Sequence, residues 1–310
     1  MSGELLAMRR AAVGAPIAEY SRLVDRARVN KGGKGTSAAA PQPVTATSLS
    51  GVTATASATP HTKGDWVELI ASTGFAAETL QIVVLTVTAS STANTSTLVD
   101  IGTGAAASEV ALISNVPIGH QTGTTGVGQA MSAMTYIFQG LAVPAGTRIS
   151  ARIQSVVVSQ TARIGVALRQ AGGPIAAGTT VTTYGADTAT SNGTIPTVAG
   201  SINTKSDWTE ITASTTADIR SFLVAISTAG GATQTANDGL VDIGIGAAAS
   251  ETVIVADIPY VGSATESHIS RGCEVPFIRA IPAGSRLSFR YQSTSTANGA
   301  RPTAVILGIN

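Results

Sequence analysis

The sequence is poor in the residues from which many catalytic and metal-binding sites are built. Its 310 residues include one cysteine, Cys273, and three histidines, His61, His120 and His268. A single cysteine excludes an intramolecular disulfide and a thiolate metal cluster. The histidines are not at a metal-ligand spacing, and no nucleophile–base arrangement stands out. We therefore predict that the protein is not an enzyme and needs no cofactor or metal.

Charged residues are also scarce. Charged residues make up 12% of the chain, about half of the usual share of roughly 25%. Such surfaces favour packing against neighbouring subunits. The net charge of +1 gives no general attraction to nucleic acid, so a nucleic-acid partner is not expected. No apolar run is long enough to span a bilayer and no signal core opens the chain, which predicts synthesis in the cytoplasm and no membrane partner.

The N-terminal residues 1–44 differ from the rest of the chain. Residues 1–34 carry seven Lys and Arg against three acids. Residues 16–30 have an apolar stripe at helical spacing, which predicts a short helix, and residues 31–43 are a Gly/Lys/Ala/Pro-rich connector. We predict an arm that docks on another subunit, although a frayed terminus is an equal alternative. The candidate interaction residues are Arg9, Arg10, Ile17, Tyr20, Val24, Arg26 and Arg28.

An internal repeat is the strongest signal in the sequence. Residues 63–73, KGDWVELIAST, match residues 205–215, KSDWTEITAST, at seven of eleven positions. Residues 98–109, LVDIGTGAAASE, match residues 240–251 at eleven of twelve positions, again at an offset of 142. Residues 143–155 match residues 281–293 at eight of thirteen positions, at an offset of 138. The repeat predicts two domains, residues 45–172 and 173–310.

Each copy has the pattern of a β-protein. Residues 80–88 are apolar and β-branched, and residues 147–157 alternate between apolar and polar side chains. Alternation predicts a strand with one face in the core and one face in solvent. The fold class is therefore all-β: two tandem antiparallel β-sandwich domains, jelly-roll-like, behind a short helical N-terminal arm. We expect seven to nine strands in each copy.

Several residues recur at equivalent positions, and for each we weigh a structural and a functional role. The aromatic pair could stack on sugars, but core or rim packing is favoured. The acids could bind a cation, but two per copy are too few for Ca²⁺; a tight turn with positive-φ glycines and a capping Asp is favoured. The arginines could pair with the repeated acids across the sheet or with a neighbouring subunit, or they could lie on a solvated face, where ion pairs add little. The recurring residues are Trp66, Trp208, Asp100, Asp242, Gly102, Gly244, Arg148 and Arg286.

The three repeated motifs together resemble a known module. The order Asp-Trp-x-Glu, Leu-Val-Asp-Ile-Gly-x-Gly-Ala-Ala-x-Ser-Glu, Pro-Ala-Gly-x-Arg-x-x-x-Arg-x-Gln is similar to a tandem β-sandwich module of virion structural proteins of tailed bacteriophages. The resemblance implies a virion component of the tail fibre, adaptor, baseplate or decoration type, with no chemistry. It also implies other virion proteins as partners, bound through the arm. We expect a homo-oligomer, a trimer or hexamer.

Two other functions stay open at this stage. A host-surface, glycan-binding protein of the particle would require exposed aromatic side chains near Tyr136, Tyr184, Tyr260 or Phe277. A hydrolase would require carboxylates that face each other across a cleft, and is the weakest of the three.

Overall fold

The structure is a computed structural model that describes residues 51–88, 96–118, 120–121, 134–170, 178–228, 235–262, 266–267 and 276–310. The predicted helical arm, with its seven candidate interaction residues, lies outside these residues, as do Cys273 and His268. The description that follows concerns the described residues alone. Among the described residues there is no helix long and apolar enough to cross a membrane.

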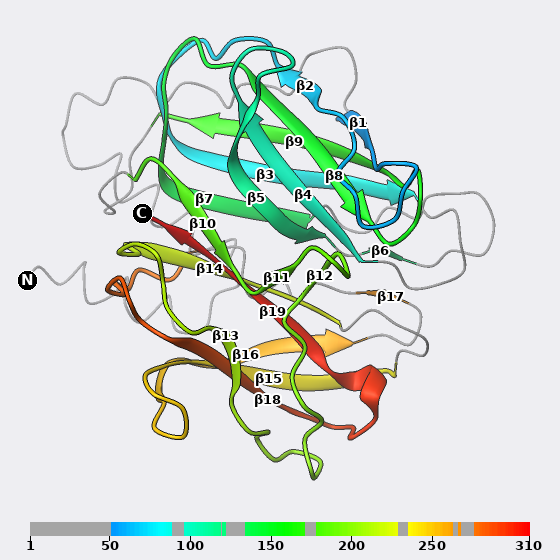
Figure 1. The fold of residues 1–310 in the computed structure, drawn as a ribbon, viewed down its shortest axis with the longest axis vertical. Coiled ribbons are helices and arrows are strands. Elements are labelled where there is room, and N and C mark those ends of the chain that lie inside the picture. Colours follow the sequence, from blue (N-terminus) through cyan, green and yellow to red (C-terminus); the bar gives the residue numbers. More distant parts are fainter. Residues whose placement is uncertain are drawn as a thin grey trace, which may run out of the picture. The chain divides into compact units, whose positions relative to one another are not determined.

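Copy 1 is a sandwich of two antiparallel four-stranded sheets (Figure 1). We call β1-β9-β3-β7 the β1 sheet and β2-β8-β4-β5 the β2 sheet. The strands are β1 (Val52–Thr55), β2 (Val67–Ile70), β3 (Ala77–Thr88), β4 (Thr97–Thr103), β5 (Val110–Ile118), β7 (Met134–Val143), β8 (Ile149–Ser155) and β9 (Thr161–Arg169). Side chains of both sheets meet in one buried cluster that includes Ile82, Ile101 and Ile164.

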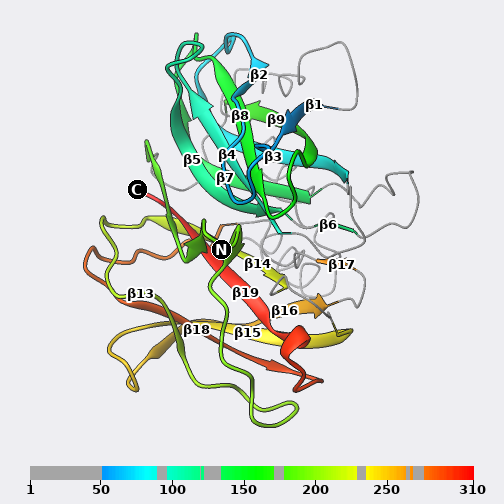
Figure 2. The ribbon, with the colours of Figure 1, turned by 45° about the vertical axis from the view of Figure 1, so that its right-hand side comes forward.

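Copy 2 repeats this arrangement (Figure 2). Its β10 sheet has the order β10-β19-β14 and its β13 sheet the order β13-β18-β15-β16. Bridges from Ile219 to Ile281 and from Phe222 to Phe277 place residues 277–281 beside β14, where β7 lies in copy 1. The strands are β10 (Val181–Tyr184), β13 (Thr209–Thr212), β14 (Ser221–Thr228), β15 (Asn237–Ile245), β16 (Thr252–Gly262), β18 (Leu287–Ser293) and β19 (Pro302–Ile309).

The strand order is that of a jelly roll. If the eight strands of copy 1 are counted along the chain, the two sheets read 1-8-3-6 and 2-7-4-5, and copy 2 gives the same order with residues 277–281 as its sixth strand. Eight strands in two such sheets define the jelly-roll architecture. The all-β, antiparallel sandwich expected from the sequence is therefore observed.

Short elements complete the described part of the chain. A hairpin joins β11 (Ala186–Asp187) to β12 (Asn192–Gly193), and β6 (His120–Gln121) of copy 1 pairs with β17 (Glu266–Ser267) of copy 2. The 3-10 turn η2 spans Asn298–Ala300.

The β10 sheet is buried on both of its faces. Alternate residues Phe222 and Val224 point into the core of copy 2, whereas Leu223 and Leu307 belong to the apolar cluster of copy 1. The strands β10, β14 and β19 all contact β5, the edge strand of the β2 sheet. Thr183 Oγ1 adds a hydrogen bond of 2.5 Å to the carbonyl oxygen of Ser114. The two copies therefore share one continuous packed region.

The polar face predicted for residues 147–157 is only partly in solvent, which corrects the sequence-based expectation: the Arg148 and Arg152 side chains are 17% and 30% exposed. Gln154 is 1% exposed and Ser150 is fully buried. The hairpin region of copy 2 covers Gln154, whose Nε2 donates to the Thr188 carbonyl oxygen at 2.9 Å and to Ser191 Oγ at 3.0 Å. Alternation thus marks the two faces of this strand correctly, but a segment from the other copy covers the second face at Gln154.

Candidate functional site

The most highly organised polar feature is a charge cluster on the outer face of the β2 sheet, centred on Asp100. Asp100 is 1% exposed and points away from the core that its neighbours in β4 line. Its Oδ1 accepts from Lys63 Nζ at 2.7 Å and from the Asn115 backbone N–H at 2.8 Å. Its Oδ2 accepts from Arg152 Nε at 2.9 Å. A buried carboxylate requires such partners, because an unpaired buried charge is strongly destabilising.

Lys63 lies between two oxygen acceptors. Besides Asp100, its Nζ donates to Asn115 Oδ1 at 2.6 Å. Burial removes water from the ammonium group and lowers the pKa of Lys63, while the nearby Asp100 carboxylate opposes this effect. The cluster thus contains a partly desolvated amine in contact with both a carboxylate and a carboxamide.

Copy 2 contains the same cluster with one substitution. Lys205 Nζ lies 2.8 Å from Asp242 Oδ1, and Arg290 Nε lies 2.9 Å from Asp242 Oδ2. Asp257 replaces Asn115, with Oδ1 2.9 Å from Lys205 Nζ. Burial by itself would raise the pKa of Asp242, but the hydrogen bonds from Lys205, the Asp257 backbone and Arg290 outweigh it and lower that pKa.

A β-bulge presents Asn115 and Asp257 to the two lysines. The register of β5 shifts between its partners Val99 and Ile101 in β4. Asn115 has φ 56° and Asp257 has φ 54°, a left-handed conformation in which Asn and Asp are enriched. The bulge aims each side chain at the neighbouring cluster, as bulges commonly do.

Each tryptophan lies over its cluster. The Arg152 guanidinium carbon is 4.3 Å from the Trp66 ring centroid, and that of Arg290 is 4.6 Å from the Trp208 centroid. These distances define cation–π contacts. A Cβ on Gly102 would lie 2.7 Å from the Trp66 ring, so the glycine is required for the close approach of the ring. Both tryptophans are half-buried on the sheet surface.

The placement of Asp100 and Gly102 corrects the predicted tight turn. Asp100 and Gly102 lie within β4, as Asp242 and Gly244 lie within β15. The turn follows instead at Gly104 and Gly246, which have φ of 113° and 120°. The glycine nearer the Asp serves ring packing, and the later one serves the turn.

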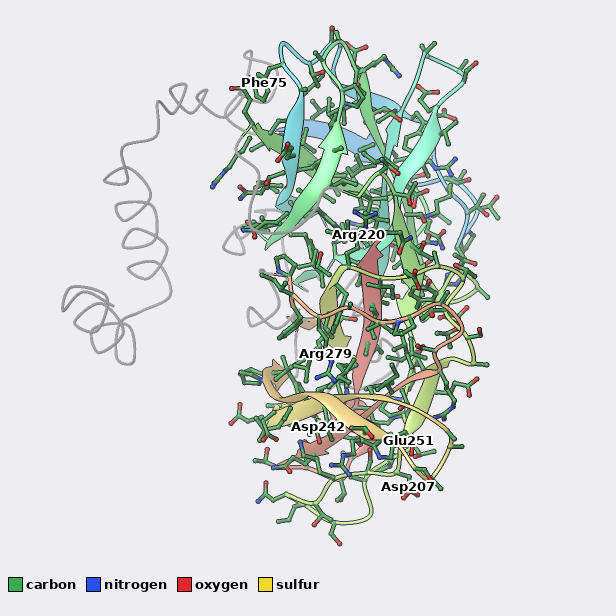
Figure 3. All side chains as sticks on the ribbon, turned by 90° about the vertical axis from the view of Figure 1, so that its left-hand side faces the viewer. Phe75, Asp207, Arg220, Asp242, Glu251 and Arg279 are labelled. Atoms are coloured by element: carbon green, nitrogen blue, oxygen red, sulfur yellow. The ribbon has the colours of Figure 1, made fainter. Side chains whose placement is uncertain are left out.

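A second charge cluster also occurs once in each copy: it is centred on Arg148 just before β8 in copy 1 and on Arg286 just before β18 in copy 2. Arg148 Nε donates to Glu68 at 2.8 Å and its Nη1 to Glu109 at 2.7 Å. Arg286 makes the same pairs with Glu210 and Glu251, at the same distances. The hydrogen bond from Arg148 lowers the pKa of Glu109, and the two acids raise the pKa of Arg148. Of the alternatives considered for the repeated arginines, pairing with the repeated acids across the sheet is the one observed. Figure 3 labels Asp242 and Glu251 of copy 2.

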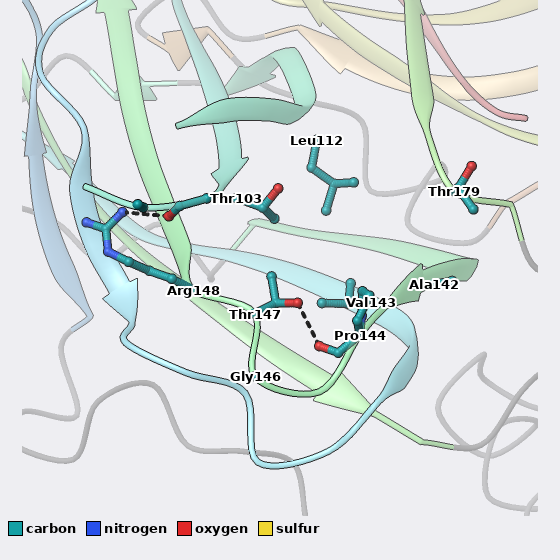
Figure 4. A pocket seen from close by; sticks show the side chains of 11 residues that line it. Thr103, Leu112, Ala142, Val143, Pro144, Gly146, Thr147, Arg148 and Thr179 are labelled. Carbon is teal, nitrogen blue, oxygen red and sulfur yellow. Dashed lines mark hydrogen bonds between the residues drawn. The ribbon is translucent and has the colours of Figure 1, made fainter. Parts of the chain in front are cut away.

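A pocket of about 680 Å³ lies next to Arg148 in copy 1 (Figure 4). The turn after β4, the turn between β7 and β8, and Thr179 surround it. Its lining combines apolar Leu112, Val143 and Pro144 with threonine side chains. Arg148 is already bound to two acids, and Thr147 Oγ1 donates to the Pro144 carbonyl oxygen at 2.7 Å. The pocket suits a small neutral group better than an ion.

The described residues hold no group of three or more His, Cys, Asp or Glu side chains able to bind a metal. His61 Nδ1 lies 3.0 Å from Ser191 Oγ, in the contact between the copies. Ser191 in turn accepts from Gln154, so this histidine belongs to a structural hydrogen-bond chain.

The aromatic side chains required for glycan stacking are not where that function needs them. Tyr136, Tyr184 and Tyr260 are 2%, 6% and 3% exposed, and Phe277 packs against the core of copy 2. The Tyr136 hydroxyl donates to the Pro117 carbonyl oxygen at 2.6 Å. Burial raises the pKa of Tyr260 well above its ordinary value. These four side chains therefore do not supply the exposed aromatic surface that a glycan-binding function would require near them.

Sequence reasoning missed four members of the charge clusters: Lys63, Lys205, Asn115 and Asp257. Both lysines open the first repeated motif, so their recurrence was a usable signal. Asn115 and Asp257 are also offset by 142, but they lie outside the quoted motifs and differ in charge. Only the structure shows that the bulge brings each of them to its lysine.

Comparison with known proteins gives little beyond this geometry. No family model and no curated protein sequence matches the chain. Among solved structures, a structure of PNGF-II is similar over 83% of this chain and 65% of its own, with 9% sequence identity and a TM-score of 0.36. The chain thus spans less than two thirds of that protein.

Proposed function

We propose that the chain is a non-catalytic structural component of a tailed-bacteriophage virion, of the tail fibre, adaptor, baseplate or capsid-decoration type. The observation that carries the proposal is the jelly-roll strand order in both copies. Jelly rolls recur in viral capsid domains and in lectins. The resemblance of the repeated motifs to a virion module supports the same conclusion.

The contact between the copies suits a protein that must resist mechanical force. The apolar outer face of the β10 sheet packs on copy 1, and the hydrogen bonds of Thr183 and Gln154 cross between copies. A continuous apolar contact resists relative motion more than the polar contacts typical of mobile domains. Tandem sandwiches joined in this way can form part of a wall or a projection.

In the proposed assembly the N-terminal arm binds other virion proteins, and the chain forms a homo-oligomer, a trimer or hexamer. The excess of seven basic against three acidic residues in 1–34 supports an electrostatic contribution to docking. Low overall charge, 12% of residues, supports extensive contact with neighbouring subunits. The protein would then be made in the bacterial cytoplasm and reside in the virion.

The alternative is a glycan-binding protein of the same particle. One observation favours it: the pocket beside Arg148 is concave, partly apolar and lined by hydroxyl groups, and its volume falls within the roughly 300–1,000 Å³ of small-molecule sites. Arg152 and Arg290 each cover one tryptophan ring, so stacking on these rings does not support it.

The experiment is mass spectrometry of purified particles from cells that express the full chain or a variant lacking residues 1–34. We expect the full chain at a fixed ratio to other particle proteins, and loss of the shortened chain from particles despite an unchanged midpoint of thermal unfolding. A full-length chain with Arg163→Ala, an exposed change in copy 1, is the control. Absence of the full chain from particles overturns the virion function, and normal incorporation of the shortened chain overturns anchoring by the arm. Glycan-array binding by a chain absent from particles would favour a separate binding protein.

A further inference from the structure

Lys63, Asp100 and Asn115 form a triad in which an amine lies between a carboxylate and a carboxamide. The Lys63 Nζ is 2.7 Å from Asp100 Oδ1 and 2.6 Å from Asn115 Oδ1. The amide carbon lies one C=O bond, about 1.2 Å, beyond that oxygen, so Nζ is at most about 3.8 Å from Asn115 Cγ. This is close to the separation of about 3–3.5 Å at which reacting atoms are aligned for attack.

Together with Arg152, the triad of copy 1 carries one excess positive charge, which amide formation would remove. Lys63 and Arg152 place two positive charges on Asp100, whereas Asn115 is neutral. In copy 2, Asp257 adds a second acid beside Lys205. Conversion of each lysine into a neutral amide leaves one arginine paired with one aspartate in both copies, Arg152 with Asp100 and Arg290 with Asp242.

We propose that Lys63 and Asn115 form an intramolecular isopeptide bond, that Lys205 and Asp257 form its counterpart in copy 2, and that Asp100 and Asp242 relay the protons. Left-handed backbone alone favours Asn or Asp at positions 115 and 257. What goes beyond that preference is the direct lysine contact at both positions, each beside a buried carboxylate.

The reaction in copy 1 is a transamidation. Asp100 accepts a proton from the Lys63 ammonium, and the free amine attacks Asn115 Cγ. A bond forms between Nζ and Cγ, and the bond from Cγ to the amide nitrogen breaks. Two of the three ammonium protons, relayed by Asp100, end on the leaving nitrogen, which departs as an ammonium ion. No oxidant, reductant or co-reactant is required.

The reaction in copy 2 is a condensation. The Lys205 amine attacks Asp257 Cγ, a bond forms between Nζ and Cγ, and one carboxylate oxygen leaves with two of the ammonium protons as water. Burial lowers the pKa of Lys63, which increases the fraction of free amine available for attack in copy 1. Asp257 is more exposed than Asn115, so water competes more effectively in copy 2, and we expect slower bond formation there.

The bonds would tie together opposite edges of a sheet. Lys63 lies just before β2 and Asn115 lies in β5, and these are the two edge strands of the order β2-β8-β4-β5. Lys205 and Asp257 join the corresponding edges of the β13 sheet. A covalent tie across the sheet would resist its separation under force, whether or not the chain belongs to a virion.

The test is intact-mass spectrometry of the full chain after denaturation, followed by proteolysis. We expect the mass to be lower than that of the linear sequence by one ammonia and one water, and we expect branched peptides that join Lys63 to Asn115 and Lys205 to Asp257. A full linear mass, with both lysines in linear peptides, overturns the proposal. Loss of ammonia with Lys63 in a linear peptide overturns it too, because a succinimide at Asn192 or Asn298, each followed by glycine, would explain that mass.

Two matched variants separate the sites. Lys63→Arg keeps the positive charge beside Asp100 but removes the amine, and it should restore only the mass of ammonia. Lys205→Arg should restore only the mass of water. Asp100→Asn keeps both reacting groups and should leave most of copy 1 unlinked. If Lys63→Arg does not fold, the branched peptides of the wild-type chain still decide the question, since they require no substitution.

Discussion

The β1 sheet and the β10 sheet are equivalent by strand order, yet their outer faces have opposite character. In copy 1 the outer positions include Gln81 paired with Ala167, and Arg169 at the end of β9. In copy 2 the corresponding register pairs Leu223 with Leu307 and ends at Ile309. Arg169 is exposed, whereas Leu223, Leu307 and Ile309 are fully buried.

This difference shows how a duplicated fold became one packed unit. The inner faces of both sheets remain apolar, because each copy needs its own core. The outer face of the β10 sheet has become a second apolar face that seals the β5 edge of copy 1. It also explains why all eight residues of β19 are buried, since such a pattern is typical of strands in sheets that are covered on both sides.

The largest loss of stability should come from a substitution in the outer face of the β10 sheet. Leu223→Ala removes a fully buried side chain from the cluster of copy 1 and should lower the free energy of unfolding by about 4 kcal/mol. The matched change Gln81→Ala, at the equivalent half-buried position, should cost less than about 1 kcal/mol. Urea denaturation of both variants measures the difference. Equal costs would mean that the two outer faces do not differ in their contribution to packing.

The charge clusters offer a second comparison, between Asn115 and Asp257. Asp100→Asn leaves Lys63 and Arg152 without a carboxylate and should cost about 3 kcal/mol. Asp242→Asn leaves Lys205 with Asp257, 2.9 Å away, and should cost about 1 kcal/mol less. The measurement is again the free energy of unfolding.

The double variant Asp242→Asn with Asp257→Asn supplies the control for that comparison. It gives copy 2 the neutral neighbour found in copy 1, and its cost should rise to that of Asp100→Asn. A cost no greater than that of Asp242→Asn alone would show that Asp257, whose side chain is 61% exposed, contributes nothing as a substitute partner.

Much of the fold could be predicted from the repeat, and the reason is physical. Two copies retain the same apolar alternation, and alternation fixes which side chains point inward. The pairing of Arg148 with Glu109 was also within reach, since both residues recur at equivalent positions. These features depend on local periodicity and on recurrence, which a sequence displays directly.

The remaining features depend on contacts between distant segments. Gln154 is buried because Thr188 and Ser191 of the other copy cover it. Asp100 was expected in a turn, yet it lies in a strand, where Lys63 and the Asn115 N–H satisfy its Oδ1 and Arg152 satisfies its Oδ2. A bulge shifts the register by one residue, and the pattern of apolar and polar residues in β5 does not predict where it occurs.

The smallest difference in stability between the copies should appear on acidification, because the pKa values of Glu109 and Glu251 are shifted in the same direction. Arg148 lowers the pKa of Glu109 from its ordinary value of 4.5. Burial alone would raise the pKa of Glu251, but the hydrogen bond from Arg286 and backbone hydrogen bonds outweigh it and lower that pKa too. A folded-state pKa below the unfolded one adds stability that is complete above about pH 5 and is lost as the pH falls through the folded value.

We therefore expect Glu109→Gln and Glu251→Gln each to lower stability slightly at neutral pH and to flatten its decline in acid, measured by urea denaturation from neutral to acidic pH. The exposed Glu78→Gln controls for loss of one charge, and a decline as steep in the two cluster variants as in wild type would contradict the assignment. A flatter curve for one cluster variant alone would show that the copies differ here as well.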